Sequence, residues 1–232
     1  MNFPSRGLLM LALVLAAINL RPGITSFAPL IERIAEELSL SRGLISLTTA
    51  LPVLLMGLLA PLAPRLAVRF GLERSISLCL GLIGVALLLR LFGHNAVLLI
   101  GTAGLVGAGI AVAGPLLSGF IKRYFLERMG QTAAWYSLSM AVGGTLGVVV
   151  TAPATEVMGQ DWTRGLALWA LPALAASTWV PVGRGLPRPS RVKARTIMSS
   201  AEIWLNEALY PAWGQRFRVL RELARTRSEF QD

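Results

Sequence analysis

The sequence predicts an all-α membrane protein, a bundle of six transmembrane helices followed by a polar tail. Of the 232 residues, 54% are hydrophobic and 15% are charged, a combination that soluble domains rarely show. Six apolar runs are each long enough to cross about 30 Å of hydrocarbon as a helix, in which every backbone polar group is satisfied. Basic residues gather in alternate loops, as they do in proteins that cross a membrane several times.

The predicted spans follow one another with short loops between them. The first run has one alternative, a secretory signal, because Arg6 precedes its apolar core. No small-x-small cleavage site follows, however, and five further apolar runs come after it. Residues 183–232 form a basic tail, which we expect to be cytoplasmic and either disordered or partly an amphipathic helix. The six spans cover about residues 8–28, 44–64, 75–92, 96–120, 131–153 and 165–182.

The loop charges predict that both chain termini lie in the cytoplasm. Lys and Arg are frequent in segments 65–74, 121–130 and 184–195, whereas the short loop 93–96 has neither. Cytoplasmic loops are enriched in these residues, so the basic segments are placed inside and the chain is assigned to the cell inner (plasma) membrane. This topology accounts for the formal net charge of +10, and a nucleic-acid partner is therefore not expected.

Small residues recur at helical spacing in the fourth and fifth spans. Lipid tails are as apolar as leucine, so membrane helices associate through close packing of small residues. Gly107 and Gly109 in the fourth span, and Gly143 and Gly147 in the fifth, are the predicted packing positions. We expect these two helices to lie inside the bundle.

The sharpest candidate for a functional residue is Arg21 in the first span. This span carries no other charge in its interior. A charge at a helix centre costs about 2.5–3.5 kcal/mol on insertion scales, so such residues usually face a bundle interior or an aqueous cavity. Snorkelling to the outer interface is the alternative. The candidate substrate site is completed by polar residues on the same helix face, in the second span and at the start of the fifth span. For the aromatic residue among them, the alternative is a place in the interfacial belt, where aromatics at a helix start usually lie. The candidates are Arg21, Thr25, Thr49, Tyr136 and Ser139.

Arg90 lies near the outer end of the third span, where we expect it to snorkel to the interface. None of the six spans contains Asp or Glu in its interior, and an intramembrane Arg without a carboxylate fits an anionic or neutral polar solute. The sequence shows no metal-ligand cluster, nucleophile arrangement or nucleotide fingerprint. Neither enzyme activity nor a metal or cofactor is therefore expected.

Five short motifs are specific enough to be compared with known families. They read Asn19-Leu20-Arg21-Pro22, Leu47-Thr48-Thr49-Ala50-Leu51-Pro52, Glu73-Arg74-Ser75, Gly107-Ala108-Gly109-Ile110 and Leu168-Trp169-Ala170-Leu171-Pro172. In this order they resemble the cyanate and 2-nitroimidazole transporter-like family of the major facilitator superfamily. The resemblance covers about residues 10–182 and implies the amino-terminal half of a twelve-helix carrier, whose substrate site lies between two six-helix halves.

The loop between the second and third spans departs from the superfamily signature. In that signature an aspartate precedes a basic residue, a glycine and a further basic residue. Arg69, Gly71 and Arg74 are the signature residues here, but Val68 stands at the aspartate position. The resemblance implies a gating role for this loop, and Val68 weakens that expectation.

The length of the chain is a second departure, since a full member has close to twice as many residues. The resemblance also ends near Gly183, which suggests a truncated or frameshifted carrier. We expect the intact form to transport a small anionic or polar solute, cyanate-like or related; the alternative is a truncated non-transporting fragment or a membrane scaffold. The expected partners are the lipid bilayer, the solute, and either a second copy as a homodimer or the missing carboxy-terminal half.

Overall fold

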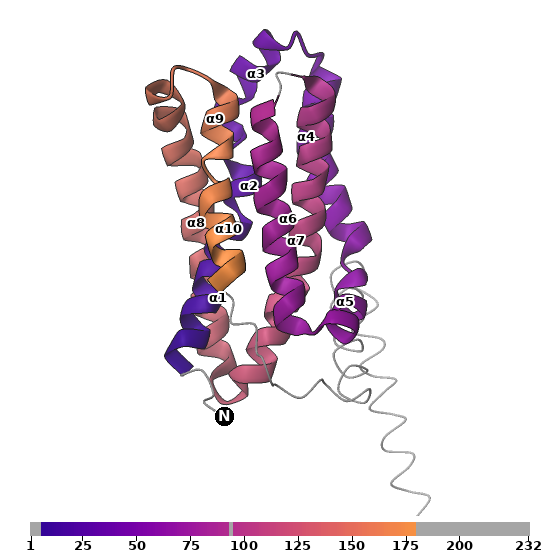
Figure 1. Ribbon diagram of the computed structural model, residues 1–232, viewed down its shortest axis with the longest axis vertical. Coiled ribbons are helices and arrows are strands. Elements are labelled where there is room, and N and C mark those ends of the chain that lie inside the picture. Colours follow the sequence, from indigo (N-terminus) through magenta and orange to yellow (C-terminus); the bar gives the residue numbers. More distant parts are fainter. Residues whose placement is uncertain (1–5, 93–94, 180–232) are drawn as a thin grey trace, which may run out of the picture. The chain divides into compact units, whose positions relative to one another are not determined.

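The computed structural model describes residues 6–92 and 95–179 of the chain. Within these ranges every regular element is a helix, and the predicted all-α fold is confirmed. Figure 1 shows the long helices running side by side along the bundle. The predicted tail of residues 183–232 lies outside the described residues.

The first predicted span is broken near its middle. Pro22 has no N–H to donate to the Ile18 carbonyl, so the regular ladder of helical hydrogen bonds is interrupted there. The chain nevertheless continues as one apolar stretch of membrane length, from Arg6 to Glu37. Its elements are α1 (Arg6–Leu20), α2 (Pro22–Thr25), the 3-10 turn η1 (Ala28–Leu30) and α3 (Ile31–Glu37).

The second predicted span is bent. Helix α4 (Arg42–Leu59) is followed after a short break by α5 (Leu62–Phe70), and the two helices meet at an angle of 63°. Gly71 ends α5 with φ of 92° and ψ of 154°, a backbone conformation that is essentially restricted to glycine. The chain can therefore reverse sharply into the third span.

The remaining helices follow with short connections. Helix α7 begins after Asn95, whose side-chain oxygen accepts a hydrogen bond from the Val97 N–H at 2.8 Å and so caps the helix. The elements are α6 (Leu72–Leu89), η2 (Arg90–Phe92), α7 (Ala96–Tyr124), η3 (Leu126–Arg128), α8 (Met129–Val157), α9 (Trp162–Ala167) and α10 (Ala170–Trp179).

By length and composition, four helical stretches of the described chain can cross a membrane, or five if α4 and α5 form one bent span. Helices α9 and α10 occupy the position of the sixth predicted span. They are separated by Leu168 and Trp169, and neither is long enough to cross a bilayer by itself. The presence of six spans therefore stays a prediction.

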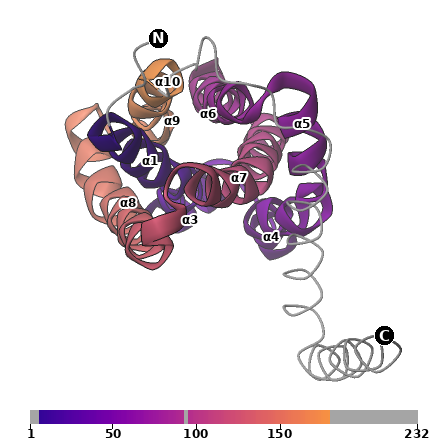
Figure 2. The same cartoon turned by 90° about the horizontal axis from the view of Figure 1, so that it is seen from below.

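The helices are arranged around a central pair. Figure 2 looks along the bundle and shows α1 and α7 in the centre, α4 and α8 on one side, and α6 and α10 on the other. Helix α4 packs against α7, and α8 packs against α1 and α2. On the opposite side α6 packs against both α7 and α10. Helices that are far apart in the sequence thus lie next to each other.

Two clusters of buried apolar side chains hold the bundle together. The main core joins α1, α6, α7 and α10 and includes Leu13, Leu20, Ile76, Ile83, Leu87 and Leu117. A smaller cluster, named the outer cluster here, joins the η1–α3 segment to α7 and α9. It consists of Phe27, Leu30, Ile34, Leu99, Trp162 and Leu166.

The four glycines predicted as packing positions all lie where two helices meet. A Cβ at any of them would come closer than 3.0 Å to an atom of the neighbouring helix, which real Cβ atoms essentially never do. Glycine therefore permits close approach of the backbones, the usual basis of helix association in a bilayer. The pairs are Gly107 on Pro52, Gly109 on Ile83, Gly143 on Ile18, and Gly147 on Thr25.

Candidate functional site

Arg21 lies at the break between α1 and α2, and its side chain is exposed. Its carbonyl accepts hydrogen bonds from the N–H groups of Ile24 and Thr25, both at 3.0 Å, and from the Thr25 hydroxyl at 3.1 Å. These bonds fix the backbone of Arg21 at the break. Its guanidinium forms no hydrogen bond or ion pair within the part of the chain that the structure describes.

Helix α8 supplies the surface next to Arg21. A Cβ at Gly144 would lie 3.7 Å from the Arg21 Cβ and 3.8 Å from the Thr25 Cγ2, which are ordinary contact distances. Tyr136, two turns earlier on α8, is half-buried, and its hydroxyl is close enough to Arg21 to interact electrostatically. The structure thus brings together three of the predicted site residues, Arg21, Thr25 and Tyr136. Sequence reasoning missed Gly144, whose only signal is its place beside Gly143.

The other two candidates are not joined to this group. The Ser139 side chain is 5% exposed, and its hydroxyl donates to the Trp135 carbonyl at 2.7 Å. The Thr49 hydroxyl is exposed on α4 and donates to the Ser46 carbonyl at 2.9 Å. Both hydroxyl protons are thus bound by the residue's own helix, and no hydrogen bond links either residue to Arg21 among the described residues.

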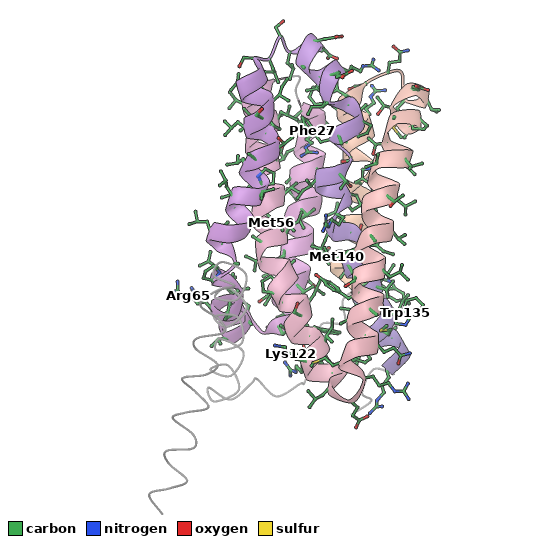
Figure 3. All side chains as sticks on the ribbon, turned by 180° about the vertical axis from the view of Figure 1, so that it is seen from behind. Phe27, Met56, Arg65, Lys122, Trp135 and Met140 are labelled. Carbon is green, nitrogen blue, oxygen red and sulfur yellow. The ribbon has the colours of Figure 1, made fainter. Side chains whose placement is uncertain are left out.

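Figure 3 looks onto the side of the bundle that α4 and α8 flank, with Met56 on α4 and Met140 on α8. We call the group formed by Arg21, Thr25, Tyr136 and Gly144 the Arg21 site. A guanidinium presents five N–H donors and stays charged, and a tyrosine hydroxyl can add another donor. The site therefore suits a compact anion or a polar molecule with hydrogen-bond acceptors. No cluster of three metal-binding side chains occurs within residues 6–92 and 95–179.

The sequence profile of the Major Facilitator Superfamily matches this chain over residues 9–223. The chain belongs to that superfamily. It is 36% identical over 200 residues to the uncharacterised transporter YycB of Bacillus subtilis. It is 33% identical over 201 residues to the 2-nitroimidazole transporter of Escherichia coli, and 35% identical over 168 residues to the cyanate transport protein CynX of the same species.

The matches cover 86%, 86% and 72% of this chain but only 49%, 50% and 44% of the three relatives. The chain thus spans about half the length of the curated relatives it matches. The resemblance to cyanate and 2-nitroimidazole carriers is confirmed, and the chain is a multi-pass membrane protein. The superfamily match runs to residue 223, so the expectation that the resemblance ends near Gly183 is wrong, and the frameshift hypothesis loses its support.

The superfamily's signature loop lies between α5 and α6. The acidic residue that forms contacts there is Glu73, which is not a position of the signature. Glu73 is 8% exposed; its carboxylate accepts the Tyr124 hydroxyl at 2.6 Å and lies 3.5 Å from Arg123. Of the signature residues, Arg69 stacks on Phe70, with 5.4 Å from its guanidinium carbon to the ring centre, and Arg74 is exposed. Within the described chain, therefore, the carboxylate that ties α6 to α7 belongs to Glu73, whereas Val68 occupies the aspartate position.

Arg90 is buried, whereas the sequence led us to expect that it snorkels to the interface. Its side chain is 2% exposed, where η2 packs against α7 and α9. Its Nε donates to the Thr102 hydroxyl at 3.3 Å, and its Nη1 is buried without a partner among the described residues. An apolar helix face does not distinguish a lipid neighbour from a protein neighbour, so the sequence around Arg90 carries no signal of this burial.

Proposed function

We propose that this chain provides the amino-terminal half of a transport pathway for a small anionic or polar solute, and that the Arg21 site binds the solute. The observation that carries the proposal is the guanidinium of Arg21, which is exposed at a helix break and has no counter-ion within the described residues. A charge in the middle of an apolar span is costly and usually marks a substrate path. Membership of a transporter superfamily supports the same function.

The chemistry of the relatives' solutes is consistent with this site. One relative is named for cyanate and another for 2-nitroimidazole. Cyanate is a small anion, and a nitro group carries two oxygen acceptors, so both can accept hydrogen bonds from a guanidinium. A site with Arg21 and Tyr136 and without a carboxylate meets this requirement. For the present chain we propose a solute of the same class, compact and rich in acceptors.

Binding of radiolabelled cyanate to the chain in lipid vesicles tests this proposal. Arg21→Ala removes a charged hydrogen-bond donor, worth about 1.5–3 kcal/mol, so cyanate binding should weaken more than about tenfold. Arg65→Ala is the matched control, because Arg65 is exposed on α5, which packs mainly against α6 and α7 rather than against α2 or α8. Equal binding by the wild type and Arg21→Ala, with Arg65→Ala also unchanged, would refute the proposal.

Uptake by the same vesicles tests a separate point, whether a second half is needed. Sites of this superfamily form between two six-helix halves. Uptake by vesicles that contain only this chain would support a homodimer, in which a second copy replaces the other half. Binding without uptake would support the need for a different carboxy-terminal half. Absence of both would favour the alternative function, a non-transporting fragment or membrane scaffold.

A further inference from the structure

Helix α5 leaves the direction of the second span. It begins after the break at Ala60 and Pro61 and meets α4 at an angle of 63°. Helix α4 alone has 18 residues, which make about 27 Å of helix, close to the thickness of the hydrocarbon core. Since the long helices run along the bundle (Figure 1), α5 extends more along the membrane interface than across the bilayer.

The two sides of α5 have different surroundings. Ala63 and Ala67 are buried at 1% and 9% exposure, where α5 packs against α6 and α7. Arg65 and Arg69 each follow one of these alanines by two residues. At about 100° of rotation per residue they lie on the opposite side of the helix, and both are exposed. Helix α5 thus turns a basic face away from the protein.

The charges on this face have no carboxylate partner within residues 6–92 and 95–179. The segments that the loop charges place at the cytoplasmic end of the bundle contain seven Lys or Arg residues in those ranges but two acids, Glu73 and Glu127. Both acids are engaged elsewhere, Glu73 by Tyr124 and Arg123, and Glu127 by Arg6. The exposed arginines that form no ion pair in the same ranges are Arg65, Arg69 and Arg74.

Apolar side chains lie next to these arginines. Val68, which stands at the aspartate position of the signature, is 50% exposed, so an apolar group is present where the signature has a negative charge. Phe70 is 44% exposed, and the Arg69 guanidinium stacks on its ring. Guanidinium groups match the oxygens of a phosphate in a bidentate manner, and aromatic side chains favour the membrane interface. The exposed surface of α5 therefore combines phosphate donors with groups that can contact acyl chains.

We propose that this surface, formed by Arg65, Val68, Arg69, Phe70 and Arg74, binds the headgroups of anionic phospholipids. The arginines contact the phosphate, and the two apolar side chains enter the boundary between headgroups and acyl chains. A zwitterionic headgroup brings a cation together with its phosphate, and the surface offers no acid to receive it, so anionic lipids are preferred. The surface is separate from the Arg21 site and does not depend on the proposed transport function.

Quenching of a fluorophore on Val68→Cys tests the proposal in vesicles that contain the full chain. A Cys79→Ala background removes the natural cysteine. The vesicles consist of phosphatidylcholine with a rising mole fraction of a lipid that carries a nitroxide near its headgroup, either phosphatidylglycerol or phosphatidylcholine. Both leaflets have the same composition, so the direction of insertion does not matter. We expect half-maximal quenching at a several-fold lower mole fraction of phosphatidylglycerol than of phosphatidylcholine.

Two double variants assign this preference to α5. Each basic residue near an anionic surface contributes a factor of about five, so Arg65→Gln/Arg69→Gln should raise the half-quenching fraction of phosphatidylglycerol about fivefold or more. The value for phosphatidylcholine should not change. Arg6→Gln/Arg128→Gln is the matched control, because it removes the same charge from exposed residues of the same predicted side. This control should keep the wild-type preference.

Three results would overturn the proposal. Equal quenching by the two lipids in the wild type would mean that another group, such as an acidic side chain of residues 202–232, occupies the arginines. An equal loss of preference in both double variants would show a general effect of charge rather than a surface on α5. Loss of the preference when inorganic phosphate replaces chloride at constant ionic strength would mean that the arginines bind free phosphate instead of a lipid.

Discussion

Gly143 of α8 lies directly against the carbonyl oxygen of Ile18 in α1, with no room for a Cβ between them. In a regular helix this carbonyl would accept the N–H of residue 22, but Pro22 has none. A glycine Cα carries a hydrogen where other residues carry the side chain, so it can approach the oxygen and form a weak C–H···O contact. The Ile18 carbonyl, which Pro22 leaves without a helical donor, is thus also the group against which α8 packs.

Gly143→Ala should destabilise the bundle. The added methyl group would overlap the Ile18 carbonyl, and overpacking of this kind usually lowers the free energy of unfolding by about 1–3 kcal/mol. Unfolding in a titration with sodium dodecyl sulfate, followed by tryptophan fluorescence, measures the change. Gly101→Ala in α7 is the control, since a Cβ there meets nothing within 4 Å and alanine favours the helix by about 1 kcal/mol. Equal destabilisation by both variants would contradict the packing argument.

Gly144 offers a way to disturb Arg21 without removing its charge. A Cβ at Gly144 would make only ordinary contacts with Arg21 and Thr25, so Gly144→Ala should bind cyanate nearly as well as the wild type. Gly144→Leu should force the Arg21 side chain from its rotamer, at about 0.5–1.5 kcal/mol, and weaken binding by up to about tenfold. The vesicle binding assay compares the two variants. If Gly144→Leu binds normally, the Arg21 side chain does not contact the solute.

The helices themselves could be predicted from the sequence, because length and hydropathy decide what can cross a bilayer. The interruption of the first helix at Pro22 can also be predicted from the sequence, since a proline removes one helical hydrogen bond. The 63° bend between α4 and α5 falls at Ala60 and Pro61, whereas Pro52 lies inside α4 and does not break it. Which proline breaks a helix and which is tolerated depends on the neighbouring helix.

The candidate site was only partly predictable. Arg21 was found because a charge within an apolar span is rare, and its neighbours Thr25 and Tyr136 lie with it in the structure. Ser139 and Thr49 were chosen for their hydroxyl groups. In a helix, serine and threonine commonly donate to a carbonyl one turn earlier, and this is how both hydroxyls are used here. The presence of a polar side chain therefore did not reveal whether its donor was available.

The Glu73 cluster predicts a difference between two substitutions of one residue. Glu73→Gln keeps an acceptor for the Tyr124 hydroxyl but removes the charge that faces Arg123, whereas Glu73→Ala removes both interactions. Hydrogen bonds to charged groups contribute about 1.5–3 kcal/mol, so Glu73→Ala should lower the free energy of unfolding by about that amount and Glu73→Gln by less. The detergent titration that is used for Gly143→Ala measures both.

Glu127 provides a matched control for Glu73. It also faces an arginine, Arg6 at 3.6 Å, but both side chains are more than three-quarters exposed. Exposed ion pairs contribute little, typically less than about 1 kcal/mol. Glu127→Ala should therefore leave the unfolding transition almost unchanged. If Glu73→Ala and Glu127→Ala had the same small effect, the buried carboxylate would not hold α6 and α7 together.

The orientation of the chain can be tested at the two ends of a single helical stretch. Leu126–Val157 is long enough to cross the membrane, and the loop charges place residue 122 inside and residue 160 outside. Leu126 and Val157 are 72% and 88% exposed on the protein surface and lie at the two ends of this stretch, where we expect a cysteine to meet the aqueous phase. The natural Cys79 is buried in α6 and is replaced in a Cys79→Ala background.

In intact spheroplasts a membrane-impermeant maleimide should label Val157→Cys at once and Leu126→Cys only after the membrane is permeabilised. The physical reason is that Lys and Arg are retained on the cytoplasmic side, and the segment next to Leu126 carries Lys122, Arg123 and Arg128. The reverse pattern would invert the topology and place the Glu73 cluster outside. Labelling of both cysteines in intact spheroplasts would mean that this stretch does not cross the membrane, which would contradict the predicted fifth span.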